Sequence, residues 1–151
     1  MTTPTREAIP TWYFVVVVVR RGERYLLIRE RKHGQTWYLP AGRVEAGERF
    51  LEAALRETLE ESGVAVALEG VIRIEHRVLP GGARVRVLFT AHPIDDRAPK
   101  TIADAHSLEA RWVTLDEAAQ LPLRGDDVLH WLSHVARGEQ IHPLSVLGDE
   151  A

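Results

Sequence analysis

The chain contains no cysteine and only one methionine among its 151 residues. The lack of cysteine excludes disulfide bonds, thiol catalysis and every zinc site that depends on thiolates. The longest apolar run, Trp12 to Val19, is too short to cross a bilayer, and the first ten residues have no apolar stretch of the kind found in signal peptides. We therefore expect a protein that does not span a membrane and that resides in the cytoplasm.

A surplus of positive charge is also missing. Lysine and arginine total 19 against 22 aspartate and glutamate residues, which gives a net charge of -3. No broad nucleic-acid surface is expected, because too few basic residues are available to neutralise many phosphates. A small phosphorylated ligand remains compatible with this balance if a cation screens an acidic site. The 45% hydrophobic and 27% charged residues are typical of one globular domain.

The pattern of segments predicts a single domain over residues 11–138, with a flexible arm at 1–10 and a tail at 139–151. Strands are predicted where β-branched and aromatic residues gather or alternate. Their ranges are 11–20, 24–29, 37–40, 64–78 (with a break near Glu69 and Gly70), 83–92 and 110–115. Strands and helices in mixed order indicate an α/β sandwich with a mixed sheet.

Three helices are predicted between and after these strands. The first covers 48–62, where Leu51, Ala54, Leu55, Thr58 and Ser62 form a helical apolar stripe, and Gly63 fits a left-handed cap. A short second helix follows Thr114, which with Glu117 matches a capping box. The third is expected to run from Asp126 to Ala136 and to end before Gly138.

Three glutamates fall on one arc of the first predicted helix. Glu57, Glu60 and Glu61 have the spacing i, i+3 and i+4. Like charges at this spacing cost about 0.2–0.5 kcal/mol per pair, so a purely structural helix gains nothing from them. A divalent cation reverses the sign, because carboxylate oxygens are the ligands that Mg²⁺ or Mn²⁺ prefers. Taken alone, the three glutamates would still be read as a solvated acidic face.

The flanking residues form a longer motif with these glutamates. Gly42 lies six residues before Glu48, Glu48 lies eight before Arg56, and the sequence RETLEESGV follows. This segment resembles the signature of the Nudix hydrolases, G-x5-E-x7-R-E-U-x-E-E-x-G-U, in eight of its nine restricted positions. The exception is Thr58, which stands where the signature has a bulky aliphatic residue. Because Thr58 lies on the apolar stripe, we expect it to affect packing rather than chemistry.

The resemblance implies an α/β/α sandwich in which a strand–loop–helix unit binds Mg²⁺, with Mn²⁺ as an alternative. It implies metal ligation by Glu57, Glu60 and Glu61, assisted by the carbonyl of Gly42, and proton abstraction by Glu57 or Glu61. Gly42 would allow a tight bend of the chain toward the metal. Arg56 would fix the rotamers of neighbouring carboxylates, in a ladder with Glu52 and Glu60 and beside Glu48. Glu48 and Gly63 are then structural positions of the signature.

Family members often add one acid from a later loop. Here Glu109 is the preferred candidate for a further metal ligand, and Asp104 and His106 are the alternatives. A surface glutamate at the start of a strand explains Glu109 almost equally well.

A second, weaker resemblance covers most of the chain after Trp37. It is to the branch of the Nudix hydrolases that degrades oxidised guanine nucleoside diphosphates, such as 8-oxo-dGDP. It suggests that Asp126 and Asp127 read purine edges, although aspartates also cap helices. Trp37 is a candidate for stacking on a base, with a core position as its alternative. Arg29 is a candidate phosphate contact, with a solvated basic loop as its alternative.

The sequence thus favours a Mg²⁺-dependent pyrophosphohydrolase acting on a small nucleotide, with an oxidised purine nucleotide as the first substrate guess. ADP-ribose, dinucleoside polyphosphates and 5′-triphosphorylated RNA stay open as substrates. A non-catalytic, nucleotide-sensing Nudix module is the alternative from another class, but every acid of the signature is present. An isopentenyl diphosphate isomerase would normally need a catalytic cysteine. Whether the chain acts as a monomer or as a homodimer stays open.

Overall fold

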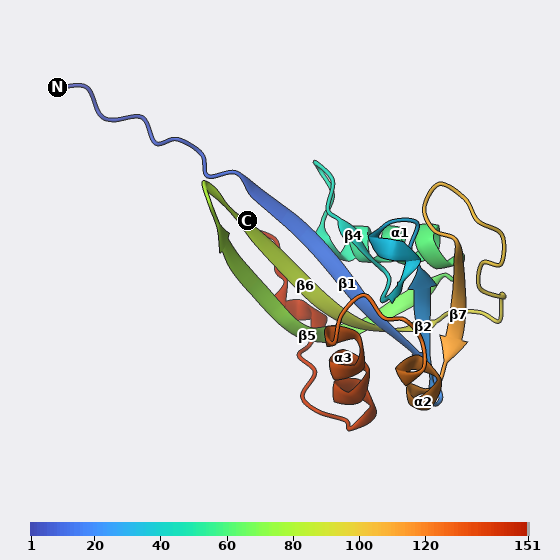
Figure 1. Cartoon of the computed structure of the whole chain (residues 1–151). Coiled ribbons are helices and arrows are strands. Elements are labelled where there is room, and N and C mark those ends of the chain that lie inside the picture. Colours follow the sequence, from blue (N-terminus) through green and yellow to red (C-terminus); the bar gives the residue numbers. More distant parts are fainter. Residues whose placement is uncertain (151) are drawn as a thin grey trace.

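The computed structural model describes residues 1–150 and shows one mixed sheet with helices on both faces (Figure 1). The strands are β1 (Thr11–Arg21), β2 (Arg24–Arg29), β3 (Trp37–Tyr38), β4 (Ala41–Arg43), β5 (Val66–Leu79), β6 (Gly82–Pro93) and β7 (Glu109–Val113). The helices are α1 (Phe50–Ser62), α2 (Leu115–Ala119) and α3 (Asp127–Ala136), with short 3-10 turns η1 (His33–Gln35) and η2 (Leu144–Val146). The predicted α/β sandwich with a mixed sheet is confirmed.

Strand β1 is the centre of the sheet. It pairs in parallel with β6 and antiparallel with both β2 and β4, and the order of the main path is β3-β2-β1-β6-β5. Strand β4 pairs with the first half of β1, whereas β7 pairs with β2. Strand β6 forms a long hairpin with β5, and this hairpin extends with β1 beyond the helices (Figure 1).

Alternation along β1 supplies both layers of the core. Val15, Val17 and Val19 point toward the side covered by α1 and lie in one apolar cluster. Val16 and Val18 point to the opposite side, where α2 and α3 cover them in a second cluster. The continuous valine run is therefore a strand buried on both faces, since all five residues are at most 2% exposed.

The predicted elements around α1 are largely confirmed. Helix α1 begins at Phe50, two residues after the predicted start, and Gly63 caps it with a left-handed φ of 73°. The predicted break near Glu69 and Gly70 is an irregularity in the pairing of β5 with β6. The placement of Leu55 in the core is wrong, because its side chain is 41% exposed. Ala53 takes the buried position instead, next to Ala54.

Two polar residues complete the buried face of α1. Thr58 and Ser62 are fully buried, and their hydroxyl groups donate to the carbonyl oxygens of Ala54 and Thr58 at 2.8 and 2.5 Å. Such bonds back to the preceding turn satisfy both hydroxyls inside the helix. Thr58, which departs from the Nudix signature, is thus accommodated in the buried face of α1, where we expected it to affect packing.

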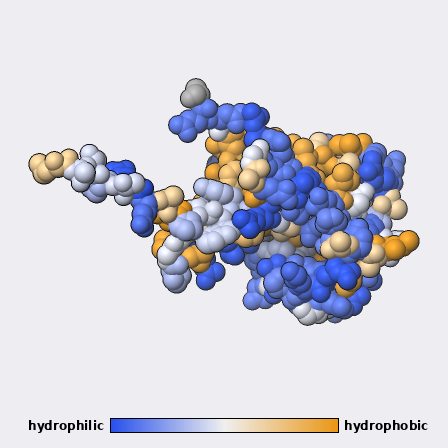
Figure 2. All heavy atoms as spheres, turned by 90° about the horizontal axis from the view of Figure 1, so that it is seen from above, coloured by the Kyte–Doolittle hydropathy of each residue, from blue (hydrophilic) through white to orange (hydrophobic). Residues whose placement is uncertain are grey.

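The two ends of the chain differ in their packing. Residues 1–10 form no helix or strand, are exposed and stand clear of the body (Figure 2). Residues after Gly138 return to the sheet, where the backbone of His142 exchanges two hydrogen bonds of 2.8 Å with Val71. Leu144 and Leu147 then pack against the core on the α1 side.

Among residues 1–150, no helix is both long enough and apolar enough to cross a membrane.

Candidate active site

Strand β4 and helix α1 bring the signature residues together as a strand–loop–helix unit. Gly42 lies in β4, and the carboxylate of Glu57 from α1 occupies the space where a side chain at Gly42 would be. A Cβ atom there would lie far inside van der Waals contact of the Glu57 carboxyl group. Gly42 lies in a paired strand opposite Val15 of β1, and its φ is not positive. Glycine is required here for space.

Glu61 lies beside the preceding residue of the same strand. The backbone N–H of Ala41 donates to Glu61 Oε1 at 2.7 Å. Burial raises the pKa of Glu61 to about 8, and the negative charge of Glu57 acts in the same direction, whereas the Ala41 hydrogen bond opposes the rise. Burial also raises the pKa of Glu57, against the effect of Arg56. Two desolvated carboxylates therefore face β4 from one helix.

Arg56 holds the remaining carboxylates in place. Its guanidinium donates to both oxygens of Glu48 at 2.6 and 2.9 Å, to Glu57 at 2.9 Å and to Glu60 at 3.1 Å. These hydrogen bonds, led by the one to Glu48, raise the pKa of Arg56 and lower that of Glu48. Glu52 is predicted to form a ladder with Arg56 and Glu60. In the structure it pairs with Arg49 instead, at 3.8 Å.

The loop before β7 closes the C-terminal end of α1. Lys100 Nζ donates to the carbonyl oxygen of Glu60 at 2.6 Å, and Ser107 Oγ donates to that of Glu61 at 2.5 Å. Asp104 pairs with Lys100 at 2.7 Å, and the hydrogen bond from Lys100 lowers the pKa of Asp104 to about 2. Asp104 is thereby engaged in holding the loop. His106 comes closer to the motif, with Nδ1 at 3.6 Å from Glu60 Oε2.

We call Glu57, Glu60 and Glu61 the acidic motif. Their carboxylates are the donor set of a site for a hard divalent cation. Among residues 1–150, no three acidic or histidine side chains already converge as closely as a metal ion would require. Two observations nevertheless fit such an ion. The space above Gly42 is kept free of a Cβ and admits the Glu57 carboxylate beside the β4 backbone. The negative charge of Glu57 contributes to the raised pKa of Glu61, and a cation between the two carboxylates would remove this repulsion.

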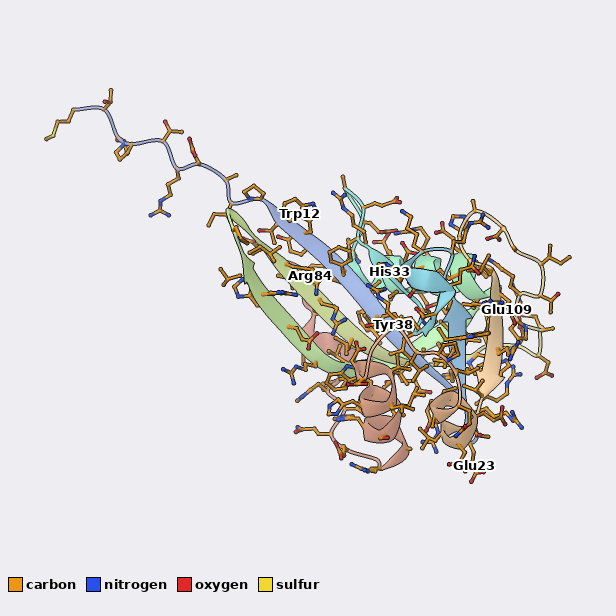
Figure 3. All side chains as sticks on the ribbon, in the orientation of Figure 1. Trp12, Glu23, His33, Tyr38, Arg84 and Glu109 are labelled. Carbon is orange, nitrogen blue, oxygen red and sulfur yellow. The ribbon has the colours of Figure 1, made fainter. Side chains whose placement is uncertain are left out.

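A cavity of about 230 Å³ opens next to Gly42. Its walls come from β1, β3, β4, β6, the residues around η1 and the loop before α3, and Figure 3 shows His33, Tyr38 and Arg84 around this region. The side chains and backbone that line it belong to Phe14, Val15, Val16, Glu30, His33, Tyr38, Ala41, Gly42, Arg84, Arg86 and Arg124. The cavity therefore places Ala41 and Gly42, the β4 residues beside which Glu61 and Glu57 lie, in one space with three arginines.

Tyr38 is the best-anchored side chain in this cavity. Its hydroxyl group donates to Asp127 Oδ2 at 2.6 Å and accepts from Arg86 Nη1 at 3.0 Å. The guanidinium of Arg124 lies over its ring, with Cζ 4.7 Å from the ring centroid. Burial and the hydrogen bond to Asp127 raise the pKa of Tyr38 to about 12. Asp127 thus positions Tyr38, while its own side chain stays 35% exposed.

Asp126 has no side-chain capping hydrogen bond at the start of α3, so the structure does not support the capping alternative for this residue. It is exposed beside Asp127.

Of the predicted site residues, Gly42 lines the cavity, and three others, Trp37, Arg29 and Glu109, lie away from both the cavity and the acidic motif. Trp37 is 4% exposed and packs in the core, with the Arg111 guanidinium over its ring at 4.9 Å. Arg29 is the last residue of β2 rather than part of a loop, and it pairs with Glu109 at 3.5 Å. Glu109 also pairs with Arg111 at 3.0 Å and lies at β7 on the far edge of the sheet from Arg84 (Figure 3). The structure thus gives none of these three residues a contact with the acidic motif.

Glu30 is an acid near the motif that sequence reasoning missed. It follows β2, its negative charge raises the pKa of Glu61, and burial raises its own pKa against the effect of Arg124. Arg124 Nη1 donates to Glu30 Oε2 at 3.1 Å. The adjacent turn is strained, since His33 and Gln35 have φ of 55° and 58°. Strain of this kind gathers at functional sites in many proteins.

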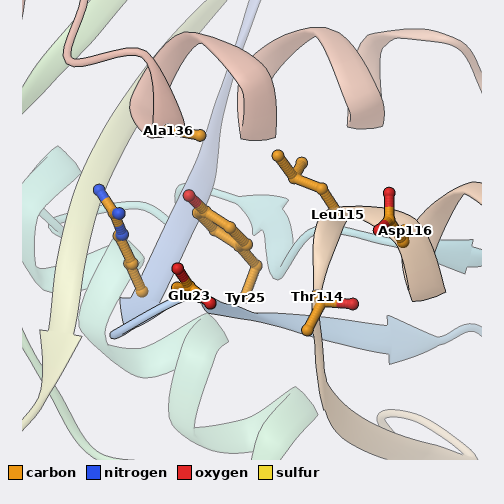
Figure 4. A pocket seen from close by; sticks show the side chains of 7 residues that line it. Glu23, Tyr25, Thr114, Leu115, Asp116 and Ala136 are labelled. Carbon is orange, nitrogen blue, oxygen red and sulfur yellow. The ribbon is translucent and has the colours of Figure 1, made fainter.

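A larger hollow of about 420 Å³ lies at the other end of β1 and β2 (Figure 4). It is bounded by Tyr25, Glu23 and Arg20 on the sheet and by Leu115, Asp116 and Ala136 on the helical side, with Thr114 between them. No residue of the signature lines this hollow. The smaller cavity is therefore the candidate active site, because it is lined by Gly42 of the signature together with Glu30 and Tyr38, whose pKa values are raised.

Comparison with known proteins gives a consistent result. The family model described as NUDIX domain matches residues 10–132. The human protein "8-oxo-dGDP phosphatase NUDT18" is 39% identical over 139 residues, which cover 87% of this chain and 42% of that protein. "Phosphatase NudJ" of Escherichia coli K12 is 29% identical over 137 residues, 89% of each chain. The chain thus spans less than half the length of the human relative.

Solved structures show the same fold. A NUDIX hydrolase from Nitrosomonas europaea superposes with a TM-score of 0.77 at 26% identity, over 93% of this chain and 98% of that one. A UDP-X diphosphatase superposes with a TM-score of 0.69 at 19% identity, over 89% and 67% of the two chains, and at this identity it supports the fold alone.

Proposed function

The chain belongs to the Nudix family, and from this premise we propose that it is a metal-dependent hydrolase that cleaves the pyrophosphate bond of a nucleoside diphosphate derivative. One observation carries the proposal. Glu57 and Glu61 face β4 at Gly42, and the same glycine lines a cavity that contains three arginines. Carboxylates suited to a cation thus lie next to guanidinium groups suited to phosphate.

The acidic motif divides into two functions in this proposal. Glu57, Glu60 and Glu61, with the carbonyl of Gly42, would hold Mg²⁺ or Mn²⁺. When bound, the ion supplies positive charge for the diphosphate and acidity for the attacking water. Glu57 or Glu61 takes the proton of that water, since both are partly desolvated carboxylates with raised pKa. Arg56 positions Glu57 and Glu60 and is itself fixed by Glu48.

For the substrate we propose an oxidised purine nucleotide such as 8-oxo-dGDP. Water adds to one phosphorus, the bridging P–O bond breaks, and the products are the nucleoside monophosphate and inorganic phosphate. The name of the human relative supports this class. Asp127 is bonded to Tyr38, which lines the cavity, and keeps part of its carboxylate exposed, and Asp126 is exposed next to it. These groups can accept hydrogen bonds from a purine edge.

Two other readings of the site remain as alternatives. ADP-ribose and dinucleoside polyphosphates present the same pyrophosphate to the acidic motif, and the arginines of the cavity suit their additional charge. A nucleotide-sensing module without turnover is the alternative from another class. The complete hydrogen-bond network around Arg56 favours the enzyme, because a module that only binds has no need of so many fixed carboxylates.

The test is hydrolysis of a nucleotide panel by purified protein with Mg²⁺, with the products separated by ion-exchange chromatography. The panel contains 8-oxo-dGDP, 8-oxo-dGTP, dGTP, ADP-ribose and a dinucleoside tetraphosphate. Glu61→Gln is the inactive variant, and Glu52→Gln, on the same helix but paired only with Arg49, is its matched control. We expect metal-dependent turnover that is highest for the 8-oxo diphosphate and lost in Glu61→Gln. Turnover of no compound would favour the sensing module.

A further inference from the structure

A second hollow of about 330 Å³ continues from the active-site cavity along the β5–β6 hairpin. Arg84 and Arg86 line both spaces, so the two are adjacent. We call the second one the arginine groove and define it by Arg73, Arg77, Arg84, Arg86 and Glu75. It lies on the end of the sheet that extends beyond the helices, where Figure 3 shows Arg84 and Trp12 (Figures 1 and 3).

The charges of the arginine groove are not balanced within the protein. Glu75 is the only acid that lines it, and this carboxylate is shared by Arg86 at 2.7 Å and Arg73 at 3.4 Å. Arg77 and Arg84 are direct partners in the antiparallel pairing of β5 with β6. Over residues 1–150, no carboxylate forms an ion pair with either of them; the ion pairs of this region involve only Glu75 and Asp127.

The pairing of Arg77 with Arg84 destabilises the folded protein unless an anionic ligand is bound between them. Like charges directly opposite each other across two strands are destabilising. Solvated arginines on an outer sheet face are the ordinary explanation for such residues, but Arg84 is only partly exposed and lies over the ring of Phe14, with Cζ 5.5 Å from its centroid. A phosphate between Arg77 and Arg84 would turn the repulsion into two charge-assisted contacts.

An exposed aromatic ring lies beside these arginines. Trp12 is the partner of Arg84 in the parallel pairing of β1 with β6, so the two side chains share a face of the sheet. Trp12 lies across Gly82, where a Cβ atom would come within 3.1 Å of its ring. The residue as a whole is nevertheless 39% exposed. A half-exposed tryptophan next to paired arginines is the combination on which single-stranded nucleotides stack.

We propose that the arginine groove binds a second nucleotide unit, with its phosphate at Arg77 and Arg84 and its base on Trp12. The inference rests on the proposed function, because the first nucleotide must occupy the adjacent cavity. A substrate that uses the groove is longer than one nucleotide, such as the end of a short oligonucleotide or a dinucleoside polyphosphate, whereas a mononucleotide such as 8-oxo-dGDP would occupy the cavity alone. Only one or two phosphates fit the arginines available, in keeping with the net charge of -3.

The test compares the affinities of two probes by isothermal titration calorimetry in the presence of Mg²⁺. The probes are dGMP and the 5′-phosphorylated dinucleotide of deoxyguanosine, neither of which contains a pyrophosphate bond. Stacking of a base on an aromatic ring contributes about 1–3 kcal/mol, so we expect the dinucleotide to bind about tenfold more tightly. Arg77→Gln and Trp12→Leu should each lower the ratio of the two affinities by about threefold or more.

Arg137→Gln is the matched control, because Arg137 is an exposed arginine outside both spaces and should leave both affinities unchanged. Equal binding of the two probes by the unmodified protein would overturn the inference, and so would an unchanged ratio in Arg77→Gln. A tetraglutamate peptide is the third probe, and binding of it as tight as that of the dinucleotide would assign the groove to acidic peptides instead.

Hydrolysis of the nucleotide panel tests the proposed function, and preference for the dinucleotide tests the groove, so each can fail without the other. If the protein hydrolyses nucleoside diphosphates but shows no preference for the dinucleotide, the groove alone is refuted. If it binds the dinucleotide more tightly but hydrolyses no member of the panel, the groove stands and the proposed reaction fails.

Discussion

The two sides of the candidate active site are built in different ways. The acidic side lies within residues 42–63, and its contacts join one strand, one loop and one helix that are consecutive in the chain. The arginine side is assembled from β1, β6 and the segments before β3 and α3, which are far apart in sequence. The first side is specified by local spacing, whereas the second depends on how the sheet is ordered.

The two sides also differ in how their charges are compensated. On the acidic side the guanidinium of Arg56 donates hydrogen bonds to Glu48, Glu57 and Glu60. The carboxylate of Glu61 accepts one from a backbone N–H. On the other side Arg124 is paired with Glu30 and Arg86 with Glu75. The acidic side thus carries more negative than positive charge, whereas Arg84 forms no ion pair with a carboxylate among residues 1–150. A metal ion with a phosphorylated ligand would correct both.

The largest effect is expected from Glu57→Gln on the acidic side. It keeps the shape of the residue above Gly42 but removes the charge needed for a cation and for proton transfer. We expect kcat to fall by about 10³-fold, within the range of general-base losses. Steady-state kinetics with Mg²⁺ measures this, with Glu52→Gln as the control. A loss confined to KM would instead place Glu57 on the substrate-binding side.

Gly42→Ala tests whether space, rather than backbone flexibility, is required at β4. The added Cβ would occupy the position of the Glu57 carboxylate and force it away. We expect kcat to fall about 100-fold, with a loss of about 1–3 kcal/mol in unfolding free energy from overpacking. Gly148→Ala is the control, because a Cβ at Gly148 meets nothing within 4 Å. Normal activity in Gly42→Ala would show that the carboxylate can relocate.

The pH dependence of stability tests the compensation on the acidic side. Glu61 has a pKa of about 8 in the folded protein, above its ordinary value of 4.5. Protonated Glu61 therefore stabilises the fold fully below about pH 4.5, and this contribution is lost as the pH rises through 8. In EDTA, denaturation with urea should show the unmodified protein losing on the order of 3 kcal/mol relative to Glu61→Gln between pH 5 and 9.

Mg²⁺ should restore part of this loss at pH 9, because a cation stabilises the ionised carboxylate. Burial raises the pKa of Glu57 and Glu30 as well, and both add to the dependence with the same sign. Identical pH profiles for the unmodified protein and Glu61→Gln would show that Glu61 is solvated in solution.

The difference between the two sides explains how much of the molecule the sequence predicted. The helical period and the signature spacing place α1 within two residues of its observed start and Gly63 at its cap. The helical period does not predict burial reliably at the edge of the apolar stripe. Leu55 lies at this edge and is 41% exposed. Local patterns also do not reveal why residue 42 is glycine, because the reason is a side chain fifteen residues further along the chain.

The arginine side was largely beyond sequence reasoning. Arg84 meets Trp12 and Phe14 only because β1 pairs in parallel with β6 in one particular register. Glu30 approaches Glu61 because β2 and β4 both border β1. One signal was available, since Arg84 and Arg86 alternate on a predicted strand and must share a face. The position of Glu109 could not be foreseen for the same reason, because the pairing of β7 with β2 places it beside Arg29.

The smallest effect is expected from Arg124→Gln on the arginine side. Arg124 contacts Glu30 and the ring of Tyr38 but no residue of the acidic motif, so its loss should weaken ligand binding without changing the chemical step. We expect KM for the best nucleotide to rise about tenfold with kcat nearly constant, as for the loss of one charge-assisted contact. Arg24→Gln, which removes an exposed arginine–glutamate pair away from the cavity, should leave both constants unchanged. If Arg124→Gln lowered kcat as much as it raised KM, the two sides would act together in the transition state, and the separation between a local chemical side and an assembled binding side would not hold.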